Sequence, residues 1–314
     1  MADPKLNYVS CPDKGPGHRM AYWEWGDPRA GHVVLCVHGL FRQGRDFDTL
    51  AQALVERSCG KVRVVCPDVV GRGKSDWLAD PAGYEIPTYV MDTLQLLGQL
   101  HAQSPIEKLD WVGTSMGGLI GMAVCGTPNL PLPAAVRRLV LNDVGPVVQW
   151  AFVARLQSYA GQVGHFQSEE EAADAMWAIS HTFGPHTREQ WLALSRPMLR
   201  PHEDGGWKLH YDPAVAVPIK ALTPETAAQG QATIWGLYDN IRARTLLTRG
   251  AQSDLLARET AMEMTCRGPK AEVVEFEGVG HAPTLVAPDQ VEAVASFLLA
   301  PDSPADEKPP GGTG

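Results

Sequence analysis

The sequence predicts an α/β fold in which a mostly parallel sheet is flanked by helices and carries an inserted helical segment. The first observation is that short, continuous apolar runs such as residues 32–37 are typical of strands covered on both faces. The second is that segments with helical spacing of their apolar residues alternate with these runs. Such alternation favours a parallel sheet with helices packed on its faces.

The elements follow one another in a regular order. We expect strands at residues 20–25, 32–37, 62–68, 109–113 and 137–143, with helices at 47–57 and 88–101 and another after residue 113. Between 144 and 240 the pattern becomes helical, with N-caps at Ser168, Thr187 and Thr223, the first two in capping boxes. Strands at 243–250 and 271–278 and a helix at 289–300 complete the pattern. We therefore predict a core domain from 1–143 and 241–300, a helical insertion at 144–240 and a disordered, proline-rich tail at 301–314.

Composition and charge exclude several classes of partner. The net charge is -9 at pH 7 and no block is rich in lysine and arginine, so we expect neither nucleic acid nor a membrane as partner. Residues 1–20 lack the apolar stretch of a signal peptide, and no apolar run approaches the roughly 18 residues of a membrane helix. The prediction is a cytoplasmic protein. Its six cysteines form no Cys-x-x-Cys pair, which favours reduced thiols over disulfides or a zinc site.

The most informative motif is a glycine-rich stretch around Ser115. Residues 113–117, with the sequence Gly-Thr-Ser-Met-Gly, follow a predicted strand and precede a predicted helix, which is the setting of a nucleophile elbow. The glycines remove side chains that would collide across so tight a turn. Two alternatives are a helix start with Ser115 as its cap and a phosphate-binding loop. The phosphate loop is the weaker alternative, because no Lys-Ser or Lys-Thr pair follows the glycines.

A serine hydroxyl needs a base and an acid to become a nucleophile. His281 follows the last predicted strand, where a parallel sheet delivers loops to its carboxyl edge, and we predict that it is the base. Asp254 follows the strand at 243–250 and is the predicted acid. Asp143, which ends the strand at 137–143, is its rival.

The remaining catalytic requirement is an oxyanion hole, commonly two backbone N–H groups. We expect them from Met116, directly after Ser115, and from Leu40, with Phe41 as the next choice, in the loop after the strand at 32–37. No His-x-x-x-His motif or carboxylate cluster indicates a metal, and we expect no cofactor.

These motifs together resemble the α/β-hydrolase superfamily along nearly the whole chain, and most closely its cap-bearing bacterial serine esterases and lactonases. Looser likenesses are to hydroxyalkanoate-oligomer hydrolases and carbon-carbon bond hydrolases. The resemblance implies that the insertion is a helical cap, that residues 68–75 form a structural turn, and that branches with an aspartate nucleophile are excluded by Ser115. The matching residues are His38-Gly39, Asp68-x-x-Gly71-x-Gly73-x-Ser75, residues 113–118, Asp254 and Gly280-His281.

The predicted function is a cofactor-free serine hydrolase that cleaves small carboxylic esters, lactones or hydroxyalkanoate oligomers through an acyl-enzyme. Two alternatives remain open, which are a carbon-carbon bond hydrolase or lyase with the same triad and a non-catalytic receptor on the same scaffold. Large apolar residues of the insertion favour a substrate with an apolar portion, and Phe41, Arg42 and Trp150 are candidate substrate contacts. An Arg-Asp pair with Asp46 or Asp48 is the alternative role of Arg42. We expect a monomer or a homodimer.

Overall fold

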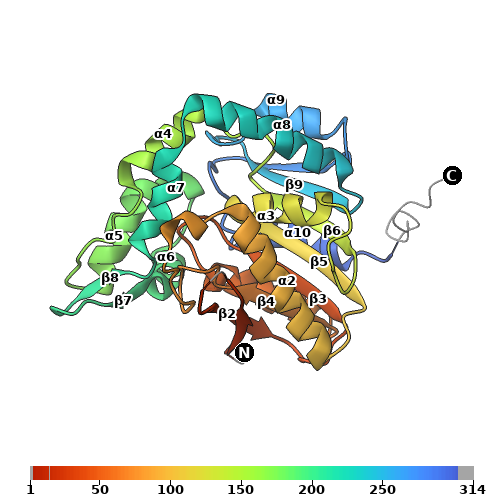
Figure 1. Cartoon of the computed structure of the whole chain (residues 1–314), viewed down its shortest axis with the longest axis horizontal. Coiled ribbons are helices and arrows are strands. Elements are labelled where there is room, and N and C mark those ends of the chain that lie inside the picture. Colours follow the sequence, from red (N-terminus) through yellow and green to blue (C-terminus); the bar gives the residue numbers. More distant parts are fainter. Residues whose placement is uncertain (1–2, 14, 303–314) are drawn as a thin grey trace.

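A central eight-stranded sheet organises the protein (Figure 1). The structure is a computed structural model and describes residues 3–13 and 15–302, so the predicted tail lies outside the described residues from 303 onward. The strand order is β1-β2-β4-β3-β5-β6-β9-β10; β1 and β2 run antiparallel to their neighbours and all other pairs are parallel. This confirms the predicted mostly parallel sheet. The strands are β1 (Lys5–Cys11), β2 (His18–Trp25), β3 (His32–Val37), β4 (Val62–Pro67), β5 (Lys108–Thr114), β6 (Val136–Asn142), β9 (Arg244–Gly250) and β10 (Glu272–Phe276).

Helices cover both faces of the sheet, as the continuous apolar strands require. Alternate residues of β3 face opposite sides: Val33 and Leu35 join one core cluster, whereas Val34 and Cys36 join the other. The first cluster includes residues of α2 (Ile86–Gln103), α3 (Met116–Gly126), α8 (Pro224–Asn240) and α9 (Arg258–Met264). The second includes α1 (Asp48–Arg57) and α10 (Pro288–Leu299). The sheet is therefore the middle layer of three.

The segment between β6 and β9 forms the helical projection beside the sheet in Figure 1. It has a small core of its own, in which the Trp191 indole N–H donates to the Ala173 carbonyl at 2.7 Å. Its elements are α4 (Trp150–Tyr159), α5 (Glu169–Ser180), α6 (Arg188–Ser195), β7 (Leu199–Pro201), β8 (Trp207–Leu209) and α7 (Ala216–Ala221), followed by α8. Short 3₁₀ turns lie at Gly44–Phe47, Pro81–Gly83, His181–Phe183, Arg196–Met198 and Pro213–Val215.

Helix α8 lies inside the predicted insertion, yet it packs on the sheet layer. A Cβ atom added to Gly126 of α3 would lie 2.1 Å from the Leu237 carbonyl oxygen of α8, so the two helices meet at a glycine. The helix thus joins the insertion to the core, and the predicted domain boundaries at 144 and 240 stay predictions.

The helix starts of the insertion follow their predicted caps with one difference. Thr187 and Gln190 form a complete capping box, and the Thr223 side chain accepts from the Thr226 backbone N–H. The Ser168 hydroxyl accepts from the Glu171 N–H, but the Glu171 carboxylate accepts from the N–H of Gln167 rather than of Ser168. The predicted box at Ser168 is therefore wrong in its second half. Within the described residues, no helix has the length and apolarity needed to cross a membrane.

Candidate active site

Ser115 sits in a strained turn between β5 and α3. Its φ is 52° and its ψ is -116°, a backbone conformation that costs a serine on the order of 1–3 kcal/mol. The Ser115 N–H donates to the Asn142 carbonyl of β6 at 3.0 Å, which ties the turn to the neighbouring strand. The turn has the geometry expected of a nucleophile elbow rather than of a simple helix cap, because the Ser115 side chain makes no capping hydrogen bond.

The glycines of the turn lie where the neighbouring backbone leaves no room for a side chain. A Cβ atom on Gly117 would lie 1.9 Å from the Val37 carbonyl oxygen, and one on Gly113 would lie 2.3 Å from the Gly117 carbonyl oxygen. Further along α3, a Cβ atom on Gly121 would lie 2.6 Å from the Trp111 indole nitrogen of β5. Glycine at these positions lets α3 start and run against the sheet.

The histidine predicted as the base lies within hydrogen-bond distance of this serine. His281 follows β10, and its Nε2 lies 2.9 Å from Ser115 Oγ. The ring of Phe152 from α4 meets the imidazole edge-on at 4.9 Å between ring centres. His281 is buried, so its orientation is fixed by protein contacts rather than by solvent.

The acid that contacts this histidine is Asp143, and the prediction of Asp254 is wrong. Asp143 Oδ2 lies 2.6 Å from His281 Nδ1, whereas the half-exposed Asp254 pairs with Arg155 of α4. Because β6 and β9 are adjacent parallel strands, loops after either strand end at the same edge beside His281. The chain order serine, acid, histidine also fits both aspartates, so neither argument could separate them.

The Asp143 carboxylate is completely buried and fully engaged. Its Oδ1 accepts from the Gly250 N–H at 2.9 Å, and its Oδ2 accepts from the Ser253 hydroxyl at 2.7 Å as well as from His281. A carboxylate only accepts, so His281 Nδ1 carries the proton and Nε2 is left free to accept the Ser115 proton. Asp143 thereby selects the imidazole tautomer that a general base needs.

The loop at residues 38–42, here called the oxyanion loop, lies over Ser115. A Cβ atom on Gly39 would contact Ser115 Cβ at 3.6 Å. Within the described part of the chain, no hydrogen bond engages the Leu40 N–H. Met116 is the first residue of α3, a position whose N–H has no intrahelical acceptor. Both groups, predicted as oxyanion donors, belong to residues that line the same cavity as Ser115.

Two buried side chains that sequence reasoning did not assign hold this loop. Burial lowers the pKa of His38 to about 3, and the neutral ring donates to the Gly39 carbonyl and accepts from the Val69 N–H. Arg72 donates through Nε to the Leu40 carbonyl at 2.9 Å and through Nη1 to the Tyr89 hydroxyl at 3.0 Å. The Gly71-x-Gly73 motif marked this turn in the sequence, but nothing in it indicated that the intervening arginine reaches the oxyanion loop.

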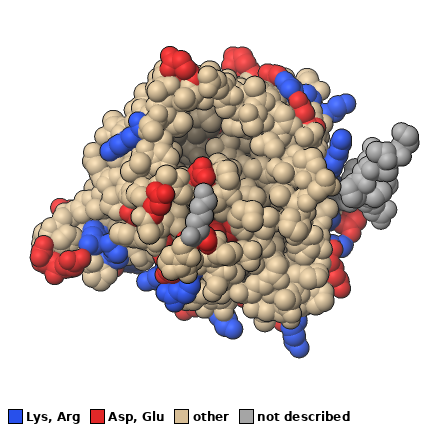
Figure 2. Space-filling view, viewed as in Figure 1, with Lys and Arg blue, Asp and Glu red and all other residues tan. Residues whose placement is uncertain are grey.

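A cavity of about 770 Å³ opens from Ser115 and His281. Its walls come from the oxyanion loop, α4, α5, α7 and α8, and its lining is mainly apolar. Figure 2 shows a hollow with mostly uncharged surroundings in the region bounded by α3, α7 and α8. Small-molecule sites commonly measure about 300–1,000 Å³, so the cavity suits a ligand of that class.

The comparisons with known proteins agree with this geometry. The sequence profile described as the alpha/beta hydrolase family matches residues 34–294. The chain belongs to this family. A 3-hydroxybutyrate-oligomer hydrolase from Cupriavidus necator is 49% identical over 300 residues, which span 95% of this chain and 98% of the relative. This alpha/beta hydrolase also resembles a solved alpha/beta hydrolase from Novosphingobium aromaticivorans, with 32% identity, a TM-score of 0.79, and 95% and 99% of the two chains covered.

A second solved structure, from Rickettsia typhi, has a TM-score of 0.81 to this hydrolase at 26% identity. The match covers 95% of this chain and 100% of the Rickettsia typhi chain. The predicted fold class and family are therefore confirmed.

The three candidate substrate contacts of the hydrolase lie in different settings. Phe41 lines the cavity and packs against Tyr211, with 5.0 Å between ring centres. Arg42 also lines it, but its Nε and Nη2 each donate to Asp46 at 2.7 Å, so the alternative of an Arg-Asp pair holds. Trp150 is the first residue of α4 and is not part of the lining, which α4 supplies through Phe152 and Val153 instead.

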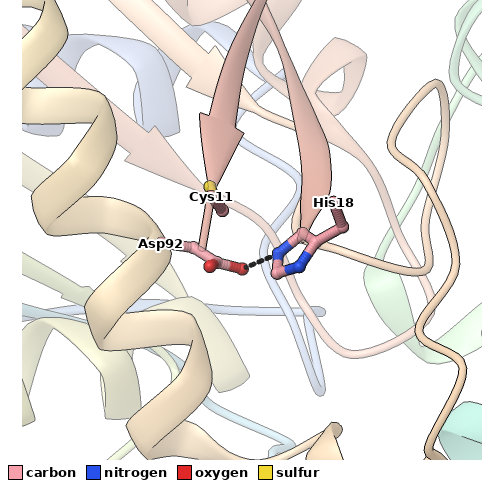
Figure 3. A group of neighbouring side chains, drawn as sticks. All are labelled: Cys11, His18 and Asp92. Carbon is pink, nitrogen blue, oxygen red and sulfur yellow. Dashed lines mark hydrogen bonds and ion pairs between the residues drawn. The ribbon is translucent and has the colours of Figure 1, made fainter. Parts of the chain in front are cut away.

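One cluster in the described part of the hydrolase has side chains suited to a metal ion, and it joins the β1-β2 hairpin to α2 (Figure 3). It consists of Cys11, His18 and Asp92, all buried. Asp92 already accepts from His18 Nε2 at 2.8 Å, and burial together with the nearby Asp92 charge raises the pKa of the Cys11 thiol. A neutral thiol is a poor metal ligand, so the cluster fits a buried hydrogen-bonded tether better than a metal centre.

Proposed function

We propose that this hydrolase cleaves the ester bonds of short 3-hydroxybutyrate oligomers, with Ser115 as nucleophile, His281 as general base and acid, and Asp143 as the residue that orients the imidazole. The observation that carries the proposal is the continuous chain of contacts from Asp143 through His281 to Ser115, which ends in an apolar cavity. The 49% identical relative that bears the name 3-hydroxybutyrate-oligomer hydrolase supports the substrate class.

The proposed chemistry uses each contact once. Ser115 Oγ attacks the ester carbonyl carbon while His281 Nε2 accepts its proton, and the Asp143 charge stabilises the imidazolium. The carbonyl oxygen becomes an oxyanion held by the Leu40 and Met116 N–H groups, each worth about 3–4 kcal/mol in such a site. His281 then gives the proton to the leaving alcohol oxygen, and the acyl group stays on Ser115.

A water molecule completes the cycle, because it now acts as the nucleophile and Ser115 Oγ is the leaving group. It loses a proton to His281 Nε2 as it attacks the acyl carbon, and the returning proton releases Ser115 Oγ and a carboxylic acid. The buried Asp143 keeps a proton on His281 Nδ1 throughout, while Nε2 gains and loses the transferred proton.

The insertion is proposed as the cap that shapes the substrate site. Phe152 and Tyr159 of α4 and Met176 of α5 line the cavity and offer an apolar surface to the methyl groups of a hydroxyalkanoate chain. Other large residues of the insertion, Trp191 among them, pack in its own core.

The deciding experiment is hydrolysis of the linear 3-hydroxybutyrate dimer and trimer with product analysis by mass spectrometry. We expect the wild type to release monomer, and Ser115→Ala to lose at least about a thousandfold in kcat while keeping its melting temperature. Cleavage of dienone acids in preference to every ester would favour a carbon-carbon bond hydrolase. Covalent labelling of Ser115 by a fluorophosphonate without turnover of any ester would favour the receptor.

The cytoplasmic location and the monomeric or homodimeric state stay predictions. Cell fractionation with an antibody against the chain tests the first, and light scattering coupled to gel filtration tests the second.

A further inference from the structure

The described lining of the cavity contains two arginines, and they differ in how far they are neutralised. Arg42 donates through both Nε and Nη2 to the Asp46 carboxylate, which makes a bidentate ion pair, and through Nη2 also to the Leu194 carbonyl. Its side chain is only 15% exposed. Its charge is shared with a carboxylate in a closed setting, so little of it is left for a ligand.

Arg155 of α4 is in a more open setting. Its only ion-pair partner within the described residues is Asp254, reached through Nη2, and the two side chains are 40% and 47% exposed. Its Nε and Nη1 make no hydrogen bond inside the described part of the chain. Ion pairs as exposed as this one contribute little free energy, so a ligand carboxylate can share or replace Asp254 at small cost.

The position of Arg155 relates it to the reacting atoms. Its guanidinium carbon lies 5.0 Å from the centre of the Phe152 ring, which lies 4.9 Å from the centre of the His281 ring. The guanidinium is therefore no more than about 10 Å from the imidazole that protonates the leaving oxygen, and both residues line the same cavity.

We propose that Arg155 binds the free carboxylate of the leaving 3-hydroxyacid unit. This inference rests on the proposed function. When the ester next to the acid end of a linear oligomer is cleaved, the leaving alcohol carries a carboxylate separated from its oxygen by a hydroxyl carbon and one methylene. A fragment of this length, with one hydrogen bond at each end, can bridge a separation up to that limit. The carboxylate thus selects the terminal ester bond and gives release of one monomer at a time.

Asp254 acts in this arrangement as a competitor rather than as part of the proton relay. Its carboxylate occupies the guanidinium when no substrate is bound, so removing its charge leaves Arg155 unpaired and strengthens the attraction for an anionic ligand. Arg155 thus favours the binding of anionic substrates and Asp254 opposes it, and neither residue affects the binding of neutral substrates.

The test compares two substrates that differ only in charge: the 3-hydroxybutyrate dimer as the free acid, and the same dimer with its terminal carboxylate replaced by a primary amide. For Arg155→Met, which keeps an unbranched stem against Phe152, we expect kcat/KM on the free acid to fall roughly 10- to 100-fold. The value for the amide is expected to stay within about twofold. Arg155→Lys retains the charge and is expected to restore part of the loss, and Asp254→Asn is expected to lower KM for the free acid alone.

The outcomes separate the two proposals. A wild type that cleaves neither dimer overturns the proposed function. A wild type that cleaves both, combined with an Arg155→Met variant that loses the same factor on the acid and the amide or loses nothing on either, overturns the carboxylate site and leaves the proposed function standing.

Discussion

Replacing Asp143 by asparagine separates the role of its charge from the role of its shape. The carboxylate accepts three hydrogen bonds in a fully buried position, from the Gly250 N–H, the Ser253 hydroxyl and His281 Nδ1. An amide of the same shape can keep Oδ1 on Gly250, but its NH₂ group then faces Ser253 and His281. A donor in that place favours the tautomer with Nδ1 unprotonated and a proton on Nε2, so Nε2 can no longer accept from Ser115.

The expected loss follows from that tautomer. In a serine protease with the same three roles, an aspartate-to-asparagine change lowers kcat by about 10⁴, equivalent to about 5.5 kcal/mol of transition-state stabilisation. We expect a loss of this order for Asp143→Asn on p-nitrophenyl butyrate at pH 7.5. Part of the activity is expected to return as the pH rises, because deprotonation of Ser115 then no longer depends on the imidazole alone. The measurement is kcat from initial rates, with the melting temperature as a check on folding.

Asp254→Asn is the matched control, because it makes the same chemical change on the neighbouring strand end. We expect its kcat on this neutral ester to stay within about threefold of the wild type, since Asp254 contacts Arg155 and not His281. A large loss in Asp254→Asn together with near-normal turnover in Asp143→Asn would refute the assignment.

Three further changes probe other parts of the site and the fold. Gly117→Ala places a Cβ atom 1.9 Å from a β3 carbonyl oxygen and is expected to destabilise the protein by at least about 1–3 kcal/mol in urea unfolding. The control, Gly98→Ala in α2, places a Cβ atom with nothing within 4 Å and is expected to be neutral or stabilising. Equal effects of the two changes would contradict the steric argument. Arg72→Met removes the donor to the oxyanion loop and is expected to lower kcat roughly 10-fold or more with KM little changed, and an unchanged kcat would argue against a positioning role. Burial lowers the pKa of His18, but its contacts with Asp92 and another nearby carboxylate outweigh this and raise the pKa overall. The stabilisation that charged His18 gains from these carboxylates is therefore fully present below the unfolded pKa of about 6.5 and is lost as the pH rises through the folded pKa. The difference in melting temperature between wild type and Asp92→Asn is therefore expected to shrink between pH 6 and pH 9, and a difference that stays constant or grows would be inconsistent with a charged pair.

The tight turn at Ser115 and the position of His281 beside it could be predicted because each is defined by residues close in sequence. Residues 113–117 contain both the serine and the glycines that allow its turn, and His281 follows the last strand directly. The same locality explains why the buried strands and the complete capping box at Thr187 were foreseen.

The aspartate that contacts His281 could not be predicted because it depends on the paths of two loops. Asp143 and Asp254 both follow parallel strands whose ends meet at one edge, and only the three-dimensional path of the two loops decides which carboxylate faces His281. The sequence also could not predict which face of α4 is turned to the cavity, and it is Phe152 and Val153 rather than Trp150 that line it. Arg155 carried no signal, because an arginine on a helix is most often a solvated side chain.

The attachment of the acid to β6 has a consequence for how the substrate range can change. Since Asp143 anchors the imidazole from the end of β6, the Asp254 side chain in the loop following β9 has no contact with the imidazole and can be exchanged without disabling the proton relay. Selection in the laboratory can therefore randomise residue 254 and recover active variants at high frequency. A homologous fold whose acid follows β9 would lack that freedom, because each substitution near its acid would also disturb the imidazole.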